Sequence, residues 1–484
     1  MTPKVTRAGD RGLLADFGAD VAATELHARA AALRAREDVV ACIVGHQSLY
    51  VIFRGAPKID FDDVPPITIA SRTHVIDVDF SGPDLDELLA QARVTREAFL
   101  TRIPSLRLTA RYLGFRAGFA YLEGWPEEWR MPRRERSRNL VPRGSFAVAG
   151  AMAGFYPVDS PGGWNLLGRT NATLWDPNAE PPNRFAPGDV VSLRAASIDH
   201  FDAPTVDRID AIGDVVAEVV MPGQLTTIVG TREWKRATYG VTPGGAFDVT
   251  AAASANRAVG NGDVPLLECV LVAPRLRFRV AKRAAFCDGS GNVRTFTLSA
   301  GEELDIGRFH GGLRGYLAIE GGIDEMRAQF AEGPRVLRKG DSLFAVSGPG
   351  TSAVASSFDR GDLHVIRVVA GPHDAPPLPE EWEVTSELNR IGIRLRRRAG
   401  GDTAGEPPAL RQTTALHDFR ELPSCGMQFG TLQWHADGSL VAMGPDHPVT
   451  GGYLQPATVI SKDLWKLAQL APGEQIRFEV VGGD

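Results

Sequence analysis

The chain has 484 residues, of which 43% are hydrophobic and 23% are charged. These proportions are ordinary for a globular protein and exclude disorder over most of the length, because enough apolar surface is present to offset the entropy lost on folding. The net charge of −6 is spread without long blocks of one sign, which argues against a dedicated nucleic-acid-binding protein. The 52 Gly and 33 Pro residues indicate many turns and short strands rather than a helical bundle, and the length predicts about three domains.

Residues 1–80 have the pattern of a small α/β domain. Helix-forming residues place Leu26, Ala30 and Leu33 on one face of a predicted helix. Apolar runs and a segment that alternates with period 2 predict strands around it. We expect the helix at 23–36 and the strands at 39–44, 49–53 and 74–80.

The remainder of the chain is predicted to be mainly β, with few helices. Short helices are expected at 83–93, at 95–100 with Thr95 as its N-cap, after a cap at Asp248, and from Ser461. Residues 196–214 lose periodicity and gain Asp, as an interdomain linker does. We expect β domains at 81–195, 215–350 and 351–484.

One local pattern occurs four times: a Gly is followed by an acidic residue and then by an alternating apolar strand. The Gly supplies the positive φ that such a turn needs, and the acid can accept a hydrogen bond from the turn backbone. The pattern predicts small closed β-barrels that are each completed by an equivalent strand. The four segments are 186–193, 299–306, 338–345 and 471–478.

The cysteines and the histidines give no sign of a metal or redox site. Cys42, Cys269, Cys287 and Cys425 lie far apart, without zinc-ligand or redox spacing, and are expected to be buried thiols in a reducing compartment. The ten histidines are scattered, so no metal site is predicted. No apolar run approaches the ~20 residues that span a bilayer, and the N-terminus lacks a signal-peptide pattern, so we expect a soluble cytoplasmic protein without membrane contact.

Three segments rich in Gly, aromatic residues and Arg could carry chemistry: 112–122, 131–145 and 156–170. P-loop, dinucleotide-binding and kinase motifs are absent from the sequence. Guanidinium groups match carboxylate and phosphate geometry, and glycine amides beside an aromatic wall suit a small planar amide or lactam. The same composition equally fits barrel corners, with Gly for bends and Arg for surface. The residues of the proposed anion pocket are Arg133, Arg138, Arg143, Ser145, Ser160, Gly162, Gly163, Trp164 and Arg169.

These segments resemble the B subunit of bacterial 5-oxoprolinase, which is also called allophanate hydrolase subunit 1. The second half resembles the C subunit, or allophanate hydrolase subunit 2. The matching pieces of that half are 222–227, 240–248, 255–261, 312–323, 430–438, 446–453 and 468–473. The resemblance covers nearly the whole chain in order, so the sequence looks like a B–C fusion. It is also similar to the carboxyltransferase region of urea carboxylase.

The resemblance implies a mainly β (α+β) fold, with the small N-terminal α/β domain followed by several cyclophilin-like β-barrels. It also implies ATP-dependent hydrolysis of a 5-oxoproline-like lactam or amide, with ATP and Mg²⁺ as cofactors and a separate A subunit as partner. A homo-oligomer stays open. The catalytic candidates are Asp248, Asp446 and Arg314. Besides the proposed anion pocket, the binding candidates are Phe115, Gly118, Asn256, Asn261, Thr450 and Tyr453.

Several positions depart from that family. Val229, Gly230 and Glu233 stand where it usually has Gln, Asp and Arg, and its Gly-Ser-Arg-Ser-Thr loop after Ile323 is missing. The scaffold glycines and aromatic residues persist while polar side chains are lost, which predicts a retained fold with weakened or absent 5-oxoproline cleavage. Two other functions therefore stay open. One is a non-catalytic regulatory relative that acts on a kinase. The other is a carboxyltransferase component of a biotin-dependent urea or amide carboxylase, which would need biotin in trans because no Met-Lys-Met attachment motif occurs.

Overall fold

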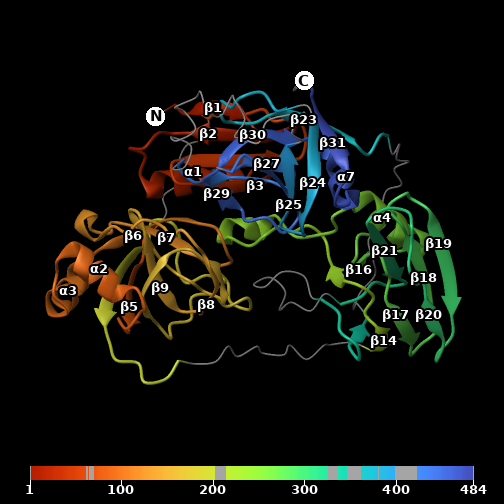
Figure 1. Cartoon of the computed structure of the whole chain (residues 1–484), viewed down its shortest axis with the longest axis horizontal. Helices are drawn as coiled ribbons and strands as arrows, with labels where there is room; N and C mark the ends of the chain where they lie inside the picture. The colour runs from red at the N-terminus through yellow and green to blue at the C-terminus, as the bar shows by residue number, and fades with distance from the viewer. Residues whose placement is uncertain are drawn as a thin grey trace, which may run out of the picture.

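The computed structural model forms a small α/β unit and three β assemblies (Figure 1). It describes residues 2–61, 64, 70–201, 214–324, 336–345, 361–379, 381–397, 422–435 and 437–482. Most of the predicted linker, at 202–213, and most of the shortened segment after Ile323, at 325–335, lie outside the described residues. The predicted domain limits stay predictions.

The N-terminal unit is a four-stranded antiparallel sheet with one helix against it. Its strands are, in spatial order, β1 (Lys4–Arg7), β2 (Gly12–Asp16), β4 (Ser48–Phe53) and β3 (Val39–Val44), and its helix is α1 (Ala23–Arg34). Leu26, Ala30 and Leu33 are fully buried in the core between helix and sheet. The predicted helix and both predicted strands are therefore confirmed, and so is the face that the helix buries.

The first barrel is a seven-stranded sheet whose two end strands are joined by backbone hydrogen bonds between Asp79 and Arg169. Its strands are, in order, β12 (Asn165–Arg169), β9 (Ser145–Ala149), β10 (Met152–Phe155), β7 (Ala120–Glu123), β6 (Leu108–Leu113), β13 (Val190–Ala195) and β5 (Thr73–Val78). Strand β5 was expected to complete the N-terminal unit. It instead pairs in parallel with β13, so that assignment is wrong although the strand itself is right.

Short elements decorate this barrel. They are α2 (Leu85–Ala92), α3 (Arg96–Arg102), and the two-stranded ribbon of β8 (Arg138–Val141) with β11 (Ser160–Gly162). Thr95 caps α3 as predicted, since its hydroxyl accepts a hydrogen bond from the Ala98 N–H. Phe99 of α3 is fully buried against the barrel core, which fixes the helix in place.

The middle assembly packs two antiparallel sheets around a shared core. The first contains β20 (Glu303–Asp305), β17 (Arg275–Phe278), β14 (Val215–Met221) and β22 (Ser342–Phe344). The second contains β15 (Thr226–Val229), β16 (Leu266–Val270), β21 (Arg314–Ile319), β18 (Lys282–Cys287) and β19 (Val293–Leu298). Helix α4 (Val249–Ala258) buries Ala251, Ala252 and Ala255 against the second sheet. Asp248 caps it as predicted, accepting hydrogen bonds from the Thr250 and Ala251 N–H groups.

The C-terminal assembly is a closed seven-stranded barrel. Its strands are, in order, β23 (Val365–Ala370), β30 (Leu454–Val459), β27 (Thr431–Trp434), β28 (Leu440–Met443), β25 (Gly392–Arg397), β24 (Glu381–Leu388) and β31 (Gln475–Val480). Its last strand runs parallel to its first, as β13 does to β5 in the first barrel. A ribbon of β26 (Cys425–Gly426) and β29 (Thr450–Gly451) and the helix α7 (Leu464–Gln469) complete it.

The four repeated turns are built alike, as the sequence pattern predicts. Gly188, Gly301, Gly340 and Gly473 have φ of 91°, 90°, 87° and 87°. The following acids, Asp189, Glu302, Asp341 and Glu474, accept hydrogen bonds from the N–H groups of Ala186, Ser299, Arg338 and Ala471. Each turn leads into a short strand, namely β13, β20, β22 or β31. The two that lead into β13 and β31 complete the first and last barrels through parallel pairing.

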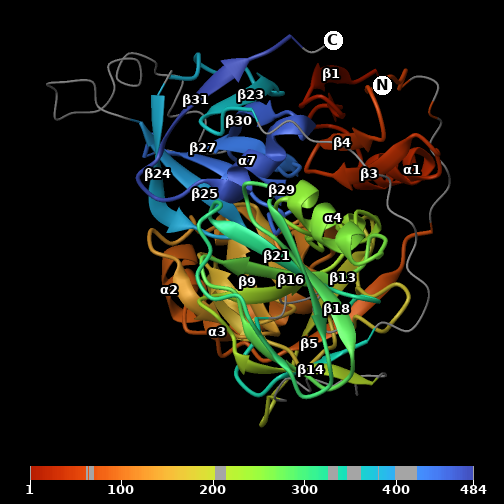
Figure 2. The same ribbon diagram turned by 90° about the vertical axis from the view of Figure 1, so that its right-hand side faces the viewer.

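The two ends of the chain pack against each other. The N-terminal unit and the C-terminal barrel lie side by side in both ribbon views (Figures 1 and 2). The N–H of His46 donates to the Ser424 carbonyl at 2.7 Å, and the Ser461 backbone and hydroxyl both donate to the Asp10 carboxylate. Apolar residues from both parts share one buried cluster, whose members include Ala8, Tyr50, Cys425 and Val449. All four cysteines lie in the described ranges; they are buried, as expected, and form no disulfide bond.

Candidate functional site

The best match to the predicted pocket is a cavity in the first barrel, which we call the aromatic cavity. Its volume is about 220 Å³. It is lined by Phe115, Phe119, Tyr121, Arg133, Ser137, Tyr156, Pro161, Gly162, Gly163 and Trp164. Five predicted binding residues meet here, namely Phe115, Arg133, Gly162, Gly163 and Trp164. They come from three chain segments that the sequence singled out separately.

Edge-to-face aromatic contacts hold the walls of this cavity. The rings of Phe119 and Trp164 lie 5.4 Å apart, and those of Phe119 and Tyr156 lie 5.3 Å apart, each nearly perpendicular to the other. Phe115 has φ of +63°, a conformation that costs a non-glycine residue about 1–3 kcal/mol and therefore tends to mark functional positions.

Burial raises the pKa of Tyr121 and of Tyr156 to about 12, although nearby Arg133 opposes the shift. Both phenols are therefore neutral near pH 7 and keep an O–H that can donate.

Among the arginines of the 131–145 segment, Arg133 is the one whose side chain lines the cavity. Among the described residues it has no ion-pair or hydrogen-bond partner for its side chain. Its neighbours differ, because Arg134 and Arg138 both bind the buried Asp84 carboxylate, at 3.0 Å and 2.7 Å. Asp84 also accepts a hydrogen bond from the Leu166 N–H, so it ties the loop to the barrel. Asp84 thus fixes the position of the loop, and the Arg133 side chain is left to bind a ligand in the cavity.

Of the predicted pocket residues, Arg138, Arg143 and Arg169, like Ser145 and Ser160, do not line the cavity, and their placement is a correction. Arg138 pairs with Asp84 instead of facing the cavity. Arg169 donates to the Arg143 carbonyl and stacks over the Phe201 ring at 4.3 Å. The sequence indicates a dense group of arginines here, but it does not reveal that Asp84 neutralises Arg138.

The predicted serines and Gly118 have mixed surroundings. The Ser145 hydroxyl donates to the Pro142 carbonyl, which is a local turn contact. The Ser160 hydroxyl is buried beside Pro161, and no partner for it occurs in the described part of the chain. Gly118 has φ of +74° and its N–H donates to the Tyr239 carbonyl, so it serves a turn.

The catalytic candidates of the second half meet at the interface of the middle assembly and the C-terminal barrel. Glu268 and Arg390, which sequence analysis did not single out, form the centre of this buried network. Arg390 binds Glu268 at 2.8 Å and both carboxylate oxygens of Asp446 at 2.7 and 2.9 Å. Arg314 lies 3.6 Å from Glu268, and its guanidinium stacks over the Phe247 ring. The arrangement joins two parts of the fold, and none of the cavities described here is lined by these four charged side chains.

The catalytic candidates Asp248 and Asp446 are both engaged by other groups of the protein and are not arranged to hold the Mg²⁺ that the resemblance implies. Asp248 accepts hydrogen bonds from the cap of α4 and from the Gln469 amide, and both oxygens of Asp446 are bound by Arg390. In the described ranges, no group of three or more His, Cys, Asp or Glu residues is arranged to hold a metal ion. These carboxylates therefore stabilise the fold in this structure and are not assigned to Mg²⁺.

The remaining predicted binding residues are distributed over other parts of the fold. Asn256 and Asn261 bind each other and nearby backbone carbonyls, which fixes the end of α4. Thr450 is buried against Gly114, and Tyr453 is exposed and stacks on His435 with ring centroids 4.3 Å apart. None of these four residues lines the aromatic cavity.

The departures from the family pattern have structural roles here. Val229 is buried among the alanines of α4, where a polar side chain would lack partners. Glu233 accepts a hydrogen bond from the Lys235 N–H and so closes a turn.

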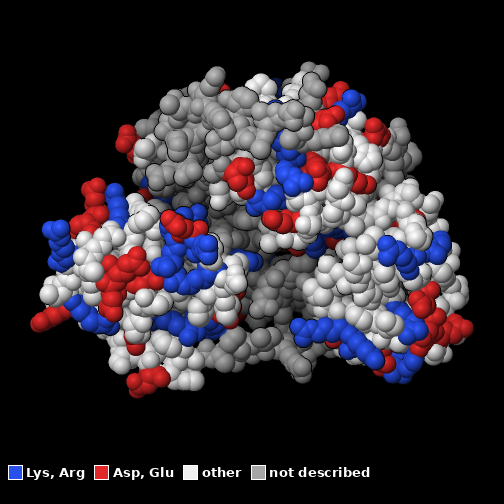
Figure 3. Space-filling view, in the orientation of Figure 1, with Lys and Arg blue, Asp and Glu red and all other residues white. Residues whose placement is uncertain are grey.

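The visible surface carries positive and negative side chains intermixed over its described residues (Figure 3), in line with the many exposed ion pairs.

Comparison with known proteins identifies the class. The sequence model described as "Carboxyltransferase domain, subdomain C and D" matches residues 3–185, and the one described as "Carboxyltransferase domain, subdomain A and B" matches 239–480. The chain therefore belongs to the carboxyltransferase-domain family and joins both regions in one polypeptide. This confirms the resemblance that the sequence motifs indicated.

Named relatives cover each half. The chain is 31% identical to the B subunit of 5-oxoprolinase from Escherichia coli O157:H7 over 167 residues, which are 32% of this chain and 77% of that protein. It is 29% identical to the C subunit of 5-oxoprolinase from Escherichia coli K12 over 296 residues, covering 54% of this chain and 90% of that protein. It is 28% identical to urea amidolyase of Lachancea kluyveri, covering 54% of this chain but 17% of that protein.

A solved structure matches the whole architecture. The crystal structure of TTHA0988 superposes with a TM-score of 0.77 at 27% identity, covering 97% of this chain and 99% of that one. The mainly β fold is thus shared along nearly the full length. No helix in the described part of this chain is long and apolar enough to cross a membrane.

Proposed function

We propose that this chain is a fused B/C-type component that acts with a separate A-type subunit in ATP-dependent hydrolysis of a small lactam or amide related to 5-oxoproline. The proposal is supported by relatives named as the B and C subunits of 5-oxoprolinase and by the two domain models that match residues 3–185 and 239–480. The aromatic cavity is the proposed substrate site. The observation that carries this assignment is the unpartnered Arg133 guanidinium, among the described residues, at a cavity walled by aromatic rings.

The cavity residues suggest how such a substrate would be held. Phe119 and Trp164 offer apolar faces for a small planar ring. Arg133 would bind the carboxylate of the substrate through charge-assisted hydrogen bonds, which are stronger than neutral ones. The neutral Tyr156 phenol would donate to the amide oxygen, where negative charge develops when the lactam is activated. ATP would supply the phosphoryl group, and completion of hydrolysis is assigned to the A-type partner.

Substrate binding tests the assignment of the cavity. Calorimetric titration of 5-oxoproline is measured on the wild type, Arg133→Ala and Arg136→Ala. Arg136 belongs to the same loop but lines a neighbouring surface cavity instead, so it is the matched control. Loss of a charge-assisted hydrogen bond costs roughly 1.5–3 kcal/mol, so Arg133→Ala should weaken binding by roughly 10- to 150-fold while Arg136→Ala should not. Equal affinity of Arg133→Ala and wild type would contradict the proposal.

Turnover tests the reaction itself. Glutamate release from 5-oxoproline is followed with ATP and a purified A-type subunit. Because Val229, Gly230 and Glu233 replace polar residues that the family usually has, we expect a rate well below the common range of about 1–10³ s⁻¹ for enzymes. A turnover number within that range would show that those polar groups are dispensable.

The relatives named urea amidolyase favour a second candidate, a carboxyltransferase step on urea or a related amide. It would need a biotin carrier protein in trans. Transfer of carboxylate from carboxybiotin to urea, measured with such a carrier, separates this candidate from lactam hydrolysis. A non-catalytic regulatory role would be indicated by substrate binding without turnover in either assay.

A further inference from the structure

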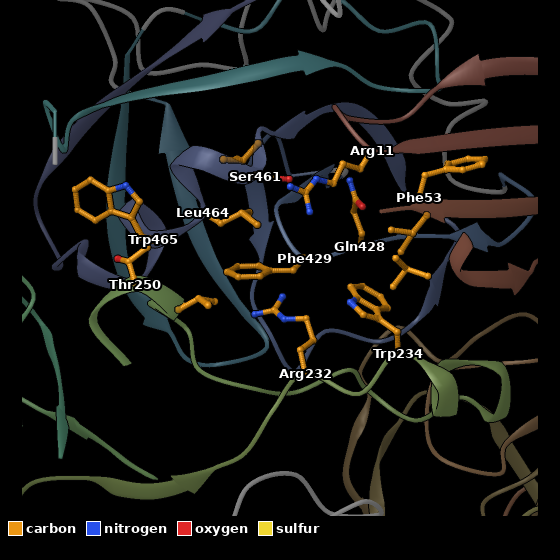
Figure 4. A pocket seen from close by; sticks show the side chains of 14 residues that line it. Arg11, Phe53, Arg232, Trp234, Thr250, Gln428, Phe429, Ser461, Leu464 and Trp465 are labelled. Carbon is orange, nitrogen blue, oxygen red and sulfur yellow. The ribbon is translucent and has the colours of Figure 1, made fainter. Parts of the chain in front are cut away.

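A second cavity lies where three parts of the fold meet, and we call it the junction cavity (Figure 4). Its volume is about 330 Å³, which is within the range of small-molecule sites. The N-terminal unit contributes Arg11 and Phe53, the segment after β15 contributes Arg232 and Trp234, and the C-terminal barrel contributes Gln428, Phe429, Ser461 and Trp465. It shares no residue with the aromatic cavity.

Two guanidinium groups enter the junction cavity without a carboxylate partner among the described residues. Figure 4 shows Arg11 and Arg232 reaching into it from opposite sides. In the described part of the chain no ion pair is formed by either residue, and the Arg11 side chain makes no hydrogen bond there. Arg232 donates one hydrogen bond, to the Ala246 carbonyl at 3.1 Å, and stacks over the Phe429 ring at 4.4 Å. Arg390 and Arg138, by contrast, are each paired with an acid.

The nearest acid in the sequence is already engaged. Asp10 precedes Arg11, but its two carboxylate oxygens accept hydrogen bonds from the Ser461 N–H and hydroxyl. That contact fixes Ser461 at the wall of the cavity, and Asp10 forms no ion pair with Arg11 in the described part of the chain. Two like charges that face one partly enclosed space repel each other unless an anion lies between them. The arrangement is therefore suited to receive a negative group from outside the chain.

The walls determine the rest of the ligand. Phe429 and Trp465 are buried, with exposed fractions of 3% and 6%, and they form fixed apolar surfaces. Trp234 is half-buried and lies across the cavity from Trp465, on the other side of Phe429 and Arg232 (Figure 4). Gln428 is 8% exposed and donates to the Ala8 carbonyl, so its side chain is held in position. A flat apolar body fits these walls and an oxyanion fits the guanidinium groups.

We propose that the junction cavity binds a small aryl anion, that is, a flat ring bearing a carboxylate or phosphate group, between Arg11 and Arg232. The site is independent of the proposed lactam site. Because its walls come from the N-terminal unit, the middle segment and the C-terminal barrel, a bound ligand would hold these three parts together. Binding therefore raises the unfolding temperature of the chain as well as occupying the cavity.

Binding of simple probes to the full chain tests this site. Benzoate and phenyl phosphate are titrated at up to about 10 mM, and binding is followed by calorimetry and by Trp fluorescence, with benzamide as the uncharged probe. We expect at least one of the two anions to bind about tenfold or more tightly than benzamide, since the guanidinium groups act on charge. Which anion binds more tightly distinguishes a carboxylate ligand from a phosphate ligand.

Variants assign the binding to the two arginines. Arg11→Gln and Arg232→Gln should each weaken binding of the preferred anion by about tenfold or more. Arg54→Gln is the matched control, because Arg54 is an exposed arginine of the same N-terminal unit that lies outside the cavity. Trp234→Phe should retain binding and reduce the fluorescence change.

Three results would overturn the proposal. The first is that neither anion binds, and the second is that benzamide binds as tightly as the anions. The third is that Arg11→Gln binds like wild type. Arg11 is exposed, so its substitution leaves the fold intact and the result can be interpreted. Unchanged affinity of the Arg133→Ala variant for the same probe would separate this site from the aromatic cavity.

Discussion

Replacing Arg390 with Met should weaken the contact between the middle assembly and the C-terminal barrel. We expect the free energy of unfolding to fall as a result. Arg390 belongs to the barrel, and its side chain is 11% exposed. It donates to Glu268 of the middle assembly, to both oxygens of Asp446 and to the Gly245 carbonyl at 2.7 Å. Methionine fills a similar space but offers no donor, so the substitution removes the cation and keeps most of the packing.

The magnitude follows from what is left behind. Glu268 and Asp446 have side chains only 2% and 9% exposed, so both carboxylates would lose their closest cation in a place that water reaches poorly. Removal of one partner from a buried ion pair typically costs about 3–5 kcal/mol. Glu268 keeps Arg314 at 3.6 Å and the Tyr316 hydroxyl at 2.9 Å, which places the expected loss toward the lower end of that range.

The loss should depend on pH. Burial alone would raise the pKa of Glu268, but the attraction of Arg390 and Arg314 outweighs it and the pKa is lowered. A carboxyl with a lowered folded-state pKa contributes stability that is complete above its unfolded value of about 4.3 and is lost as the pH falls through the folded value. The difference between wild type and Arg390→Met should therefore be largest near neutral pH and shrink below about pH 4.

Urea unfolding from pH 7 to pH 3, followed by Trp fluorescence, measures this difference. Arg394→Met is the control, because Arg394 pairs with Glu387 and Asp437, whose side chains are 72% and 63% exposed. Such surface pairs contribute about 0–1 kcal/mol. Equal losses in the two variants, or a loss for Arg390→Met that does not change with pH, would refute the reasoning.

Two further substitutions test local features. In the same urea unfolding assay, Gly473→Ala should lower the free energy of unfolding by about 1–2 kcal/mol. The cause would be backbone strain alone, because Gly473 has φ of +87° and a Cβ there meets open space. Gly361→Ala is the control and should be nearly neutral, because Gly361 also lies in open space but has no positive φ. Asp248→Ala should cost about 1–2 kcal/mol through loss of the α4 cap, in addition to the buried hydrogen bond that Asp248 accepts from the Gln469 amide. Asp248→Asn should restore the cap but not that second bond, so it should lie between wild type and Asp248→Ala; equal unfolding of the two variants would contradict a role of the cap.

Local features of the fold could be read from the sequence, whereas pairing over long distances could not. The helix Ala23–Arg34 and the four Gly–acid turns were predictable because backbone propensity and short-range hydrogen bonds determine them. Strand β5 was predicted from its alternation, but alternation does not specify a partner. Its partner β13 lies more than a hundred residues later, so its sheet was assigned wrongly.

The candidate site shows the same division. Clustering of Gly, aromatic residues and Arg singled out the segments that line the aromatic cavity, and Phe119, Tyr156 and Trp164 of these segments also belong to a buried apolar cluster. The choice among its arginines depended on Asp84, which lies 54 residues before Arg138 and is not conspicuous in the sequence. The network of Glu268 and Arg390 joins positions 122 residues apart, and no local pattern connects them.

The contact between the two ends of the chain shows how fusion lowers the affinity that an interface needs. Residues 3–185 and 239–480 match regions that occur in relatives named as two different subunits. Two separate proteins must find each other at cellular concentration, whereas two parts of one chain have an effective concentration on the order of millimolar. A junction with hydrogen bonds such as His46 to Ser424 and Ser461 to Asp10 can therefore remain assembled with modest intrinsic affinity. Covalent linkage thus leaves room at that junction for uncompensated charges and a cavity, which two freely diffusing proteins would have to fill to stay together.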